Sequence, residues 1–294
     1  MKLCLGTVQF GLDYGLHNDK VRPVDTALGV LRRAWELGVR TYDTAYAYGT
    51  AEEVLGRFLR EIPRDSYRVI SKVQLSGTAA SGFQSQIKAQ LEESLTRLGC
   101  GYLDAYLFHN AGFLKNSDAC NALMSLRSTG LTRKAGASVY RPQEADLALS
   151  LGMDFLQVPA SIFDQRFKRC DFFKRASEAG METHIRSVFL QGLLLEKPDN
   201  IPVWLNELKP YVLKFRECCE SRGLSCLEGA MMYGRTTGAD ALVFGVLDVP
   251  QLEECEQAFS APMSTTDENW LCEIAKKFAK ISEELVMPNL WKRE

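Results

Sequence analysis

Residues 38–49, Gly38-Val39-Arg40-Thr41-Tyr42-Asp43-Thr44-Ala45-Tyr46-Ala47-Tyr48-Gly49, combine a short strand with a group of chemically active side chains. The β-branched and aromatic residues that open this stretch are typical of a strand, and Gly49 marks the turn that follows. A carboxylate, Asp43, stands at the end of the predicted strand, with two phenols, Tyr46 and Tyr48, just beyond it. A buried carboxylate needs a cation or hydrogen bonds to stay charged, so the stretch predicts a partner for Asp43.

Two later strand-like runs end in polar residues of the required kind. Lys72 closes the run that begins at Tyr67, and His109 closes the run over residues 102–108. An acid, an amine and an imidazole therefore end three successive predicted strands.

Strands and helices alternate along the remaining sequence, which predicts parallel strands joined by right-handed helical crossovers. Eight strands in 294 residues favour a closed (β/α)8 TIM barrel, and we expect one domain over residues 1–294. A doubly wound open sheet is the second choice, but its usual G-x-G-x-x-G turn after the first strand is missing. The predicted helices span residues 24–37, 50–59, 83–98, 118–128, 142–149, 167–179, 202–222, 226–233, 250–259 and 269–286, with loops over 76–82 and 186–195.

Composition excludes several classes of function. The formal net charge of −2 gives no basic field for nucleic acid or for an anionic membrane surface. No signal-like segment and no apolar run long enough for a bilayer span is visible. Nine scattered cysteines suggest reduced thiols in a cytoplasmic protein, and three histidines without an H-x-x-x-H pair argue against a bound metal. Oligomeric state is not readable.

A barrel would bring these polar residues to one pocket, because the carboxyl ends of all its strands lie on the same face. Asp43 would keep Lys72 charged, and the ammonium would lower the pKa of the nearby Tyr48 phenol. Such a tyrosine can give a proton to a carbonyl oxygen, which His109 can orient. None of these groups donates hydride, so the chemistry needs a cofactor. Taken singly, the same residues are also consistent with a structural ion pair and with packing.

Nine short motifs are spread over nearly the whole sequence: Leu5-Gly6-Thr7, residues 41–49, Ile70-Ser71-Lys72, Leu103-Asp104-x-x-Leu107-x-His109, Gly136-x-Ser138, Leu156-Gln157-Val158, Gln191-Gly192-Leu193-Leu194, Phe244-Gly245 and Gln251-Leu252-Glu253-Glu254. In these motifs the sequence resembles the aldo-keto reductase family. The resemblance implies that Tyr48 is the general acid, tuned by Lys72 and Asp43, and that His109 positions the carbonyl group. It also implies a nicotinamide coenzyme held by Gly6, Thr7, Asp43, Ser138, Gln157, Arg186, Ser187, Leu190, Gln191, Gly192, Gly245, Gln251 and Glu254.

The sequence departs from the family pattern at the expected coenzyme site. Val139 follows Ser138 where the family commonly has Asn, and Arg186 replaces an aromatic residue, although its planar guanidinium can still lie against a ring. Gln251 and Cys255 stand where Arg and Asn are frequent, and Arg is the residue expected to grip a 2′-phosphate. The resemblance therefore implies NADPH by default, with NADH as the alternative. The N-terminal hairpin common in the family is not expected, because the first predicted strand already begins at residue 3.

We therefore expect an enzyme that reduces an aldehyde, ketone or keto-sugar with NAD(P)H. Phe10, Tyr14, Tyr46 and His109 are the candidate substrate contacts, with Phe113 and Trp291 as further candidates and packing as the alternative for the aromatic residues. Two other functions stay open. One is a nicotinamide-binding sensor or regulatory subunit with very slow turnover, and the other is a cofactor-free isomerase or lyase in which Lys72 forms a Schiff base.

Overall fold

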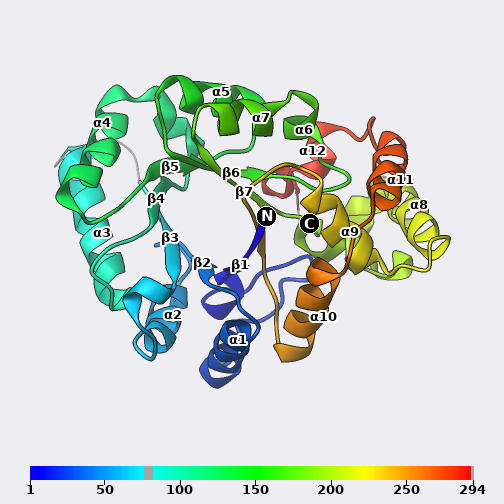
Figure 1. Cartoon of the computed structure of the whole chain (residues 1–294), viewed down its shortest axis with the longest axis horizontal. Helices are drawn as coiled ribbons and strands as arrows, with labels where there is room; N and C mark the ends of the chain where they lie inside the picture. The colour runs from blue at the N-terminus through cyan, green and yellow to red at the C-terminus, as the bar shows by residue number, and fades with distance from the viewer. Residues whose placement is uncertain (76–81, 293–294) are drawn as a thin grey trace.

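The computed structural model describes residues 1–75 and 82–292, and its centre is a closed parallel barrel surrounded by helices (Figure 1). The strands follow one another around the barrel in chain order, and β8 pairs with β1 to close it. The predicted (β/α)8 TIM barrel is confirmed. The strands are β1 (Lys2–Gly6), β2 (Thr41–Asp43), β3 (Arg68–Val73), β4 (Ala105–Phe108), β5 (Ala135–Ser138), β6 (Phe155–Pro159), β7 (Glu182–Arg186) and β8 (Ala241–Phe244).

Helices fill the connections between the strands and form the outer layer. The α-helices are α1 (Val24–Glu36), α2 (Ala51–Leu59), α3 (Phe83–Leu98), α4 (Ser117–Ser125), α5 (Pro142–Ser150), α6 (Arg166–Arg169), α7 (Phe172–Glu178), α8 (Lys209–Glu220), α9 (Cys226–Arg235), α10 (Val249–Ser260), α11 (Thr265–Lys276) and α12 (Glu283–Val286). The 3-10 helices are η1 (Val8–Phe10), η2 (Arg64–Ser66), η3 (Ala111–Lys115), η4 (Leu126–Thr129), η5 (Leu190–Leu195), η6 (Pro198–Asn200), η7 (Val203–Leu208) and η8 (Pro288–Leu290). No helix in the described ranges has the length and hydropathy of a membrane span.

The barrel interior is filled by side chains that tolerate very little extra volume. Ile70, Leu107 and Phe155 pack together inside it with no solvent exposure. A Cβ at Gly136 in β5 would overlap the backbone carbonyl of Phe155 on the neighbouring strand. The small side chains of β5 therefore let β6 and the interior residues approach closely.

Three of the predicted helices are interrupted, and a fourth, 118–128, ends as α4 at Ser125 and continues as η4. The predicted helix 167–179 is split into α6 and α7 at Asp171, which adopts a left-handed conformation with φ of 53°. The predicted helix 202–222 begins as η7 and becomes α8 at Lys209, because Pro210 is tolerated only in the first turn of a helix. The predicted helix 269–286 stops at the end of α11, and an extended Ser282 starts α12.

A second apolar cluster lies outside the barrel on the side of β7 and β8. It joins η5, α8, α9 and α11, with Phe163, Phe215 and Phe278 packed ring against ring at its centre. This cluster supports η5, which forms one wall of the cavity described below. The predicted loop 76–82 lies almost wholly outside the described residues, and the one-domain organisation stays a prediction.

Candidate active site

A buried ion pair links the carboxyl ends of β2 and β3. The Lys72 ammonium donates to Asp43 Oδ1 at 2.6 Å and to the Thr44 carbonyl oxygen at 2.8 Å, while the side chains of Lys72 and Asp43 are 1% and 5% exposed. The second Asp43 oxygen accepts a hydrogen bond from the Gln157 amide, in the middle of β6. The partner that the sequence predicted for Asp43 is therefore Lys72.

Tyr48 and His109 lie above this pair. Their rings meet edge to face with 5.5 Å between centroids, and Lys72 Nζ is 5.1 Å from the centre of the Tyr48 ring. The four strand-end and loop residues that the sequence singled out are thus brought together at one end of the barrel, next to a cavity that Asp43, Tyr48 and His109 line.

The electrostatics of the phenol differ from the prediction. Burial, with a contribution from the Asp43 carboxylate, raises the pKa of Tyr48 well above its ordinary value of 10.0. The predicted lowering by Lys72 is wrong for the free protein, because the ammonium is already neutralised by Asp43. Burial and the nearby Lys72 lower the pKa of His109 to about 4, so its imidazole is neutral near pH 7.

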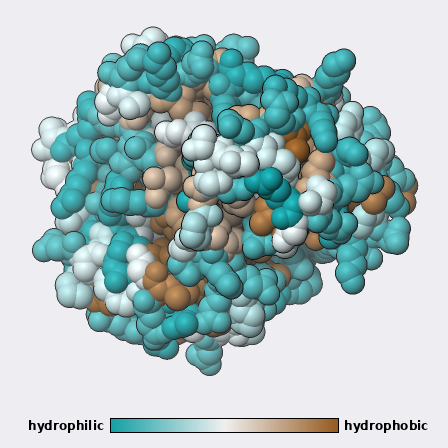
Figure 2. All heavy atoms as spheres, turned by 45° about the vertical axis from the view of Figure 1, so that its right-hand side comes forward, coloured by the Kyte–Doolittle hydropathy of each residue, from teal (hydrophilic) through white to brown (hydrophobic). Residues whose placement is uncertain are grey.

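The cavity has a volume of about 530 Å³ and runs from these residues along the ends of β7, β8 and β1. Hydrophilic residues cover most of the face shown in Figure 2, and apolar residues appear mainly toward its recessed centre. Most predicted site residues line the cavity: Gly6, Thr7, Tyr14, Asp43, Tyr48, His109, Ser138, Gln157, Arg186, Ser187, Gln191, Gly192, Gly245, Gln251 and Glu254.

Other predicted site residues do not line it. Lys72 lies behind Asp43, and Leu190 and Phe10 are each 1% exposed within the apolar cores. Tyr46 turns away and donates its hydroxyl to Glu93 on α3 at 2.7 Å. Phe10 is therefore a packing residue, which was the alternative stated for it, and Tyr46 bonds to α3 outside the cavity.

Several lining residues were not singled out from the sequence. Gln9 and Tyr140 are the most informative, and Val8, Val188, Phe189, Leu227, Val243 and Phe244 add apolar surface. Tyr140 comes two residues after Ser138, and Gln9 two residues after Thr7. Proximity to a strand end was the only available signal for either.

Comparison with known proteins gives the family of the chain. The model of the Aldo/keto reductase family matches residues 2–276. The chain belongs to the aldo/keto reductase family. It is accordingly an oxidoreductase by family.

Several proteins are similar to this aldo/keto reductase, over different shares of the two chains. The uncharacterized oxidoreductase YqkF of Bacillus subtilis (strain 168) is 27% identical over 82% of this chain and 85% of that protein. L-galactose dehydrogenase of Arabidopsis thaliana is 27% identical over 78% and 76%. An aldo-keto reductase of Mycolicibacterium vanbaalenii is 33% identical, and the match spans 56% of this chain and 59% of that protein.

Solved structures support the fold of this aldo/keto reductase. The holo form of aldo-keto reductase AKR11C1 from Bacillus halodurans matches with a TM-score of 0.77 at 21% identity, over 97% of this chain and 95% of that one. Glycerol dehydrogenase AKR11B4 from Gluconobacter oxydans matches with a TM-score of 0.73 at 20% identity, over 95% and 93%.

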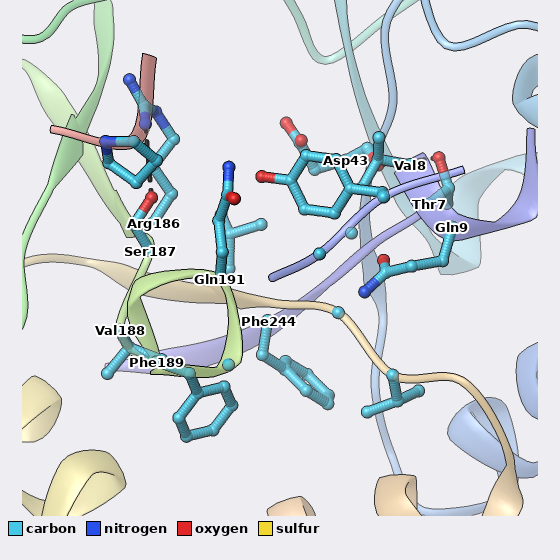
Figure 3. A pocket seen from close by; sticks show the side chains of 18 of the residues that line it. Thr7, Val8, Gln9, Asp43, Arg186, Ser187, Val188, Phe189, Gln191 and Phe244 are labelled. Carbon is cyan, nitrogen blue, oxygen red and sulfur yellow. Dashed lines mark hydrogen bonds between the residues drawn. The ribbon is translucent and has the colours of Figure 1, made fainter. Parts of the chain in front are cut away.

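Arg186 ends β7 at the cavity wall of the reductase. Its guanidinium donates to Ser138 Oγ at 3.3 Å, to Ser187 Oγ at 3.4 Å and to the Val139 carbonyl oxygen at 3.1 Å. It also lies over the Tyr140 ring, 4.2 Å from the centroid. In the view of Figure 3, Arg186 and Asp43 lie on opposite sides of the pocket, with the Gln191 side chain between them.

The segment that follows Arg186 is conformationally strained. Ser187, Leu190 and Gln191 have φ values of 62°, 49° and 57°, and Gly192 has φ of 97°. Positive φ is costly for residues other than glycine and often marks ligand-binding segments. The strained turn exposes Gln191 and Gly192 to the cavity while Leu190 is anchored in the second apolar cluster.

The polar atoms at the reacting end of the aldo/keto reductase suit a carboxamide. Gln157 uses its amide nitrogen on Asp43, which leaves its buried Oε1 without a hydrogen-bond partner in the described residues. Ser138 Oγ accepts from Arg186 and still has a hydroxyl proton to donate. One acceptor and one donor side by side match the amide group of nicotinamide.

Proposed function

We propose that this protein is an NAD(P)H-dependent reductase that converts a carbonyl group of an aldehyde, ketone or keto-sugar into an alcohol. The observation that carries the proposal is a protonated phenol, Tyr48, set beside a neutral imidazole, His109, at the lip of a long cavity. Beneath them the Lys72–Asp43 pair is sealed from solvent.

The coenzyme site is proposed from the cavity lining. Gln157 and Ser138 would hold the carboxamide, and the backbone around Gln191 and Gly192 would meet the phosphates. Gly6 and Gly245 line the cavity, and a Cβ on Gly245 would displace the end of the Gln9 side chain, which lies 2.5 Å from it. A reduced nicotinamide bound there supplies the hydride that no side chain of the chain can supply.

The protein's own groups would handle the proton. Tyr48 keeps its proton at neutral pH and donates it to the carbonyl oxygen. His109, neutral because of its lowered pKa, can donate a hydrogen bond to the same oxygen and orient the substrate. Lys72, whose ammonium lies 5.1 Å from the Tyr48 ring centre, holds Asp43 in place. The positive charge that favours charge development on the phenolic oxygen during transfer is that of Arg186, which lowers the pKa of Tyr48 against the larger effect of burial.

The same geometry argues against a Schiff-base enzyme. Such chemistry requires a free, accessible amine, whereas Lys72 is 1% exposed and bonded to both Asp43 and the Thr44 carbonyl. The reductase interpretation uses Lys72 as the structure presents it.

The choice between NADH and NADPH depends on the far end of the cavity. Gln251 and Glu254 of α10 line that end, and Arg186 is the single Arg or Lys among the lining residues in the described ranges. A 2′-phosphate would thus meet the Glu254 carboxylate and no nearby cation, which favours NADH over the family default of NADPH.

The deciding experiment is a Tyr48→Phe substitution. Intrinsic tryptophan fluorescence would be titrated with NADH and with NADPH, and turnover followed by loss of reduced-nicotinamide absorbance on a panel of aldehydes, ketones and keto-sugars. We expect the wild-type protein to turn over a substrate of the panel. The Tyr48→Phe variant should bind the coenzyme with unchanged affinity but lose kcat by at least about 10²-fold, the usual contribution of a general acid.

Three other results would have separate meanings. Unchanged turnover in Tyr48→Phe would refute the assignment of the acid. Tight coenzyme binding without turnover on any substrate in the wild-type protein would favour the sensor function. Absence of coenzyme binding would refute the proposal as a whole. The names of two similar proteins, L-galactose dehydrogenase and glycerol dehydrogenase, are the reason to include sugars and polyol-derived carbonyls in the panel.

A further inference from the structure

Arg186 is a cation without a counterion. Its hydrogen bonds go to two hydroxyls and one carbonyl, on Ser138, Ser187 and Val139, and it forms no salt bridge with a carboxylate anywhere in the described part of the chain. It is half-buried at the cavity wall. A charge in such a place is screened less than a charge on the open surface.

The guanidinium is also fixed in position. It spans from β7 to the end of β5 through its hydrogen bonds and lies on the Tyr140 ring, so it cannot swing into solvent without losing these contacts. A planar cation held on an aromatic face keeps both its position and its orientation.

The charge of Arg186 reaches the reacting end of the cavity. It lowers, in part, the pKa values of Tyr14 and Tyr48, which burial raises, and it contributes to the lowered pKa of His109. The other nearby cation, Lys72, is paired with Asp43 at 2.6 Å. The carboxylates Asp19 and Glu254 also line the cavity, but neither pairs with Arg186. The reacting end therefore has an excess of positive charge.

We propose that Arg186 makes this site discriminate between the two redox forms of the coenzyme, binding the neutral reduced nicotinamide ring and repelling the cationic oxidised ring. The inference rests on the proposed coenzyme site. Its consequence concerns occupancy: the protein would load with reduced coenzyme and release the oxidised form readily, so that oxidised coenzyme competes weakly for the site. By linkage, the ratio of the two dissociation constants is also the factor by which binding shifts the bound coenzyme toward its reduced form.

The test uses binding and does not depend on finding the substrate. Dissociation constants for NADH and NAD⁺, and for NADPH and NADP⁺, would be measured by calorimetry on the full chain carrying Arg186→Gln, Arg186→Lys or the matched control Arg57→Gln. Arg57 is exposed on α2, so the control makes the same change of charge away from the cavity. Circular dichroism verifies that each variant is folded.

We expect Arg186→Gln to lower the ratio of oxidised to reduced dissociation constants by about tenfold or more, as removal of a unit charge from a poorly screened site should. Arg186→Lys, which keeps the charge, should retain most of the wild-type ratio, and Arg57→Gln all of it. An unchanged ratio in Arg186→Gln, or an equal loss of both affinities, would overturn the inference while leaving the proposed function intact. Failure of the wild-type protein to bind either form would overturn the proposed function itself.

Discussion

Replacement of Lys72 by methionine tests the buried ion pair on which the site is built. Methionine has a similar length and no charge, so Lys72→Met preserves much of the packing while removing the ammonium. Asp43 would then be left 4% exposed in the protein interior with a hydrogen bond from the Gln157 amide as its main remaining contact. The Thr44 carbonyl oxygen would lose its donor as well.

The expected cost follows from the desolvation of the stranded carboxylate. Removing one partner of a buried ion pair typically destabilises a protein by about 3–5 kcal/mol. Total stabilities are about 5–15 kcal/mol, so the variant should lose a large share of its stability. The double variant Lys72→Met/Asp43→Asn removes both charges and keeps an amide able to meet Gln157. It should cost only about 1–3 kcal/mol, since what is left is unpaired neutral hydrogen-bonding capacity.

Urea unfolding followed by tryptophan fluorescence measures these differences, because the chain has four tryptophans. The diagnostic result is a double variant more stable than the Lys72→Met single variant. If the single variant loses less than about 1 kcal/mol, or if the double variant is the less stable of the two, then the Asp43 charge is not held by Lys72 and the description of the site is wrong.

Two further predictions concern other charged groups. Glu182, at the start of β7, accepts hydrogen bonds from Arg68 at 2.7 and 2.8 Å, from Lys134 at 2.8 Å and from His184 at 2.9 Å. Glu182→Gln should therefore reduce the unfolding free energy by about 2–4 kcal/mol and lower the melting temperature. Coenzyme affinity should stay unchanged, because these hydrogen bonds lie at the end of the barrel opposite the cavity. The pKa of His109 is about 4 in the folded protein, against 6.5 for an ordinary histidine. Between pH 6.5 and pH 4 the imidazole is therefore protonated in the unfolded chain but not in the folded one, and the unfolding free energy should fall by up to roughly 3 kcal/mol over this range. Urea midpoints from pH 7 to pH 4.5 should fall less steeply for His109→Gln than for the wild-type protein, and identical slopes would contradict the depressed pKa.

The members of the site were predictable because each one ends a strand. In a parallel barrel, strand ends converge whatever the loops do, so Asp43, Lys72 and His109 are brought together by topology alone. Residues inside turns have no such constraint. Tyr46 and Tyr48 are two positions apart, yet Tyr48 lines the cavity while Tyr46 bonds to Glu93 outside it. Their spacing in the sequence does not determine the direction of either side chain.

Helix interruptions were missed for a related reason. The apolar pattern of residues 167–179 suits one continuous helix, but the chain turns at Asp171, where a left-handed backbone separates α6 from α7. Aspartate is one of the few non-glycine residues that tolerate this conformation. Its presence therefore allows the break, but an aspartate in the sequence does not by itself predict one. Periodicity reports burial rather than continuity: α6 buries Phe167 and α7 buries Phe172, Phe173 and Ala176 on either side of the break.

The distribution of charge was the part of the site least accessible from sequence. The sequence supplies one carboxylate, Asp43, and two cations, Lys72 and Arg186, for the surroundings of Tyr48. The sequence interpretation assigned Lys72 the role of lowering the pKa of the phenol. The structure reverses the assignment: the ammonium is bonded to Asp43 at 2.6 Å, and the Asp43 carboxylate adds to the effect of burial in raising the pKa of Tyr48. Arg186, which has no carboxylate partner in the described ranges, is the cation that lowers the Tyr48 pKa, against the larger effect of burial. Arg186 therefore places the uncompensated positive charge of the site at its wall, where it acts at once on the phenol of Tyr48 and the imidazole of His109.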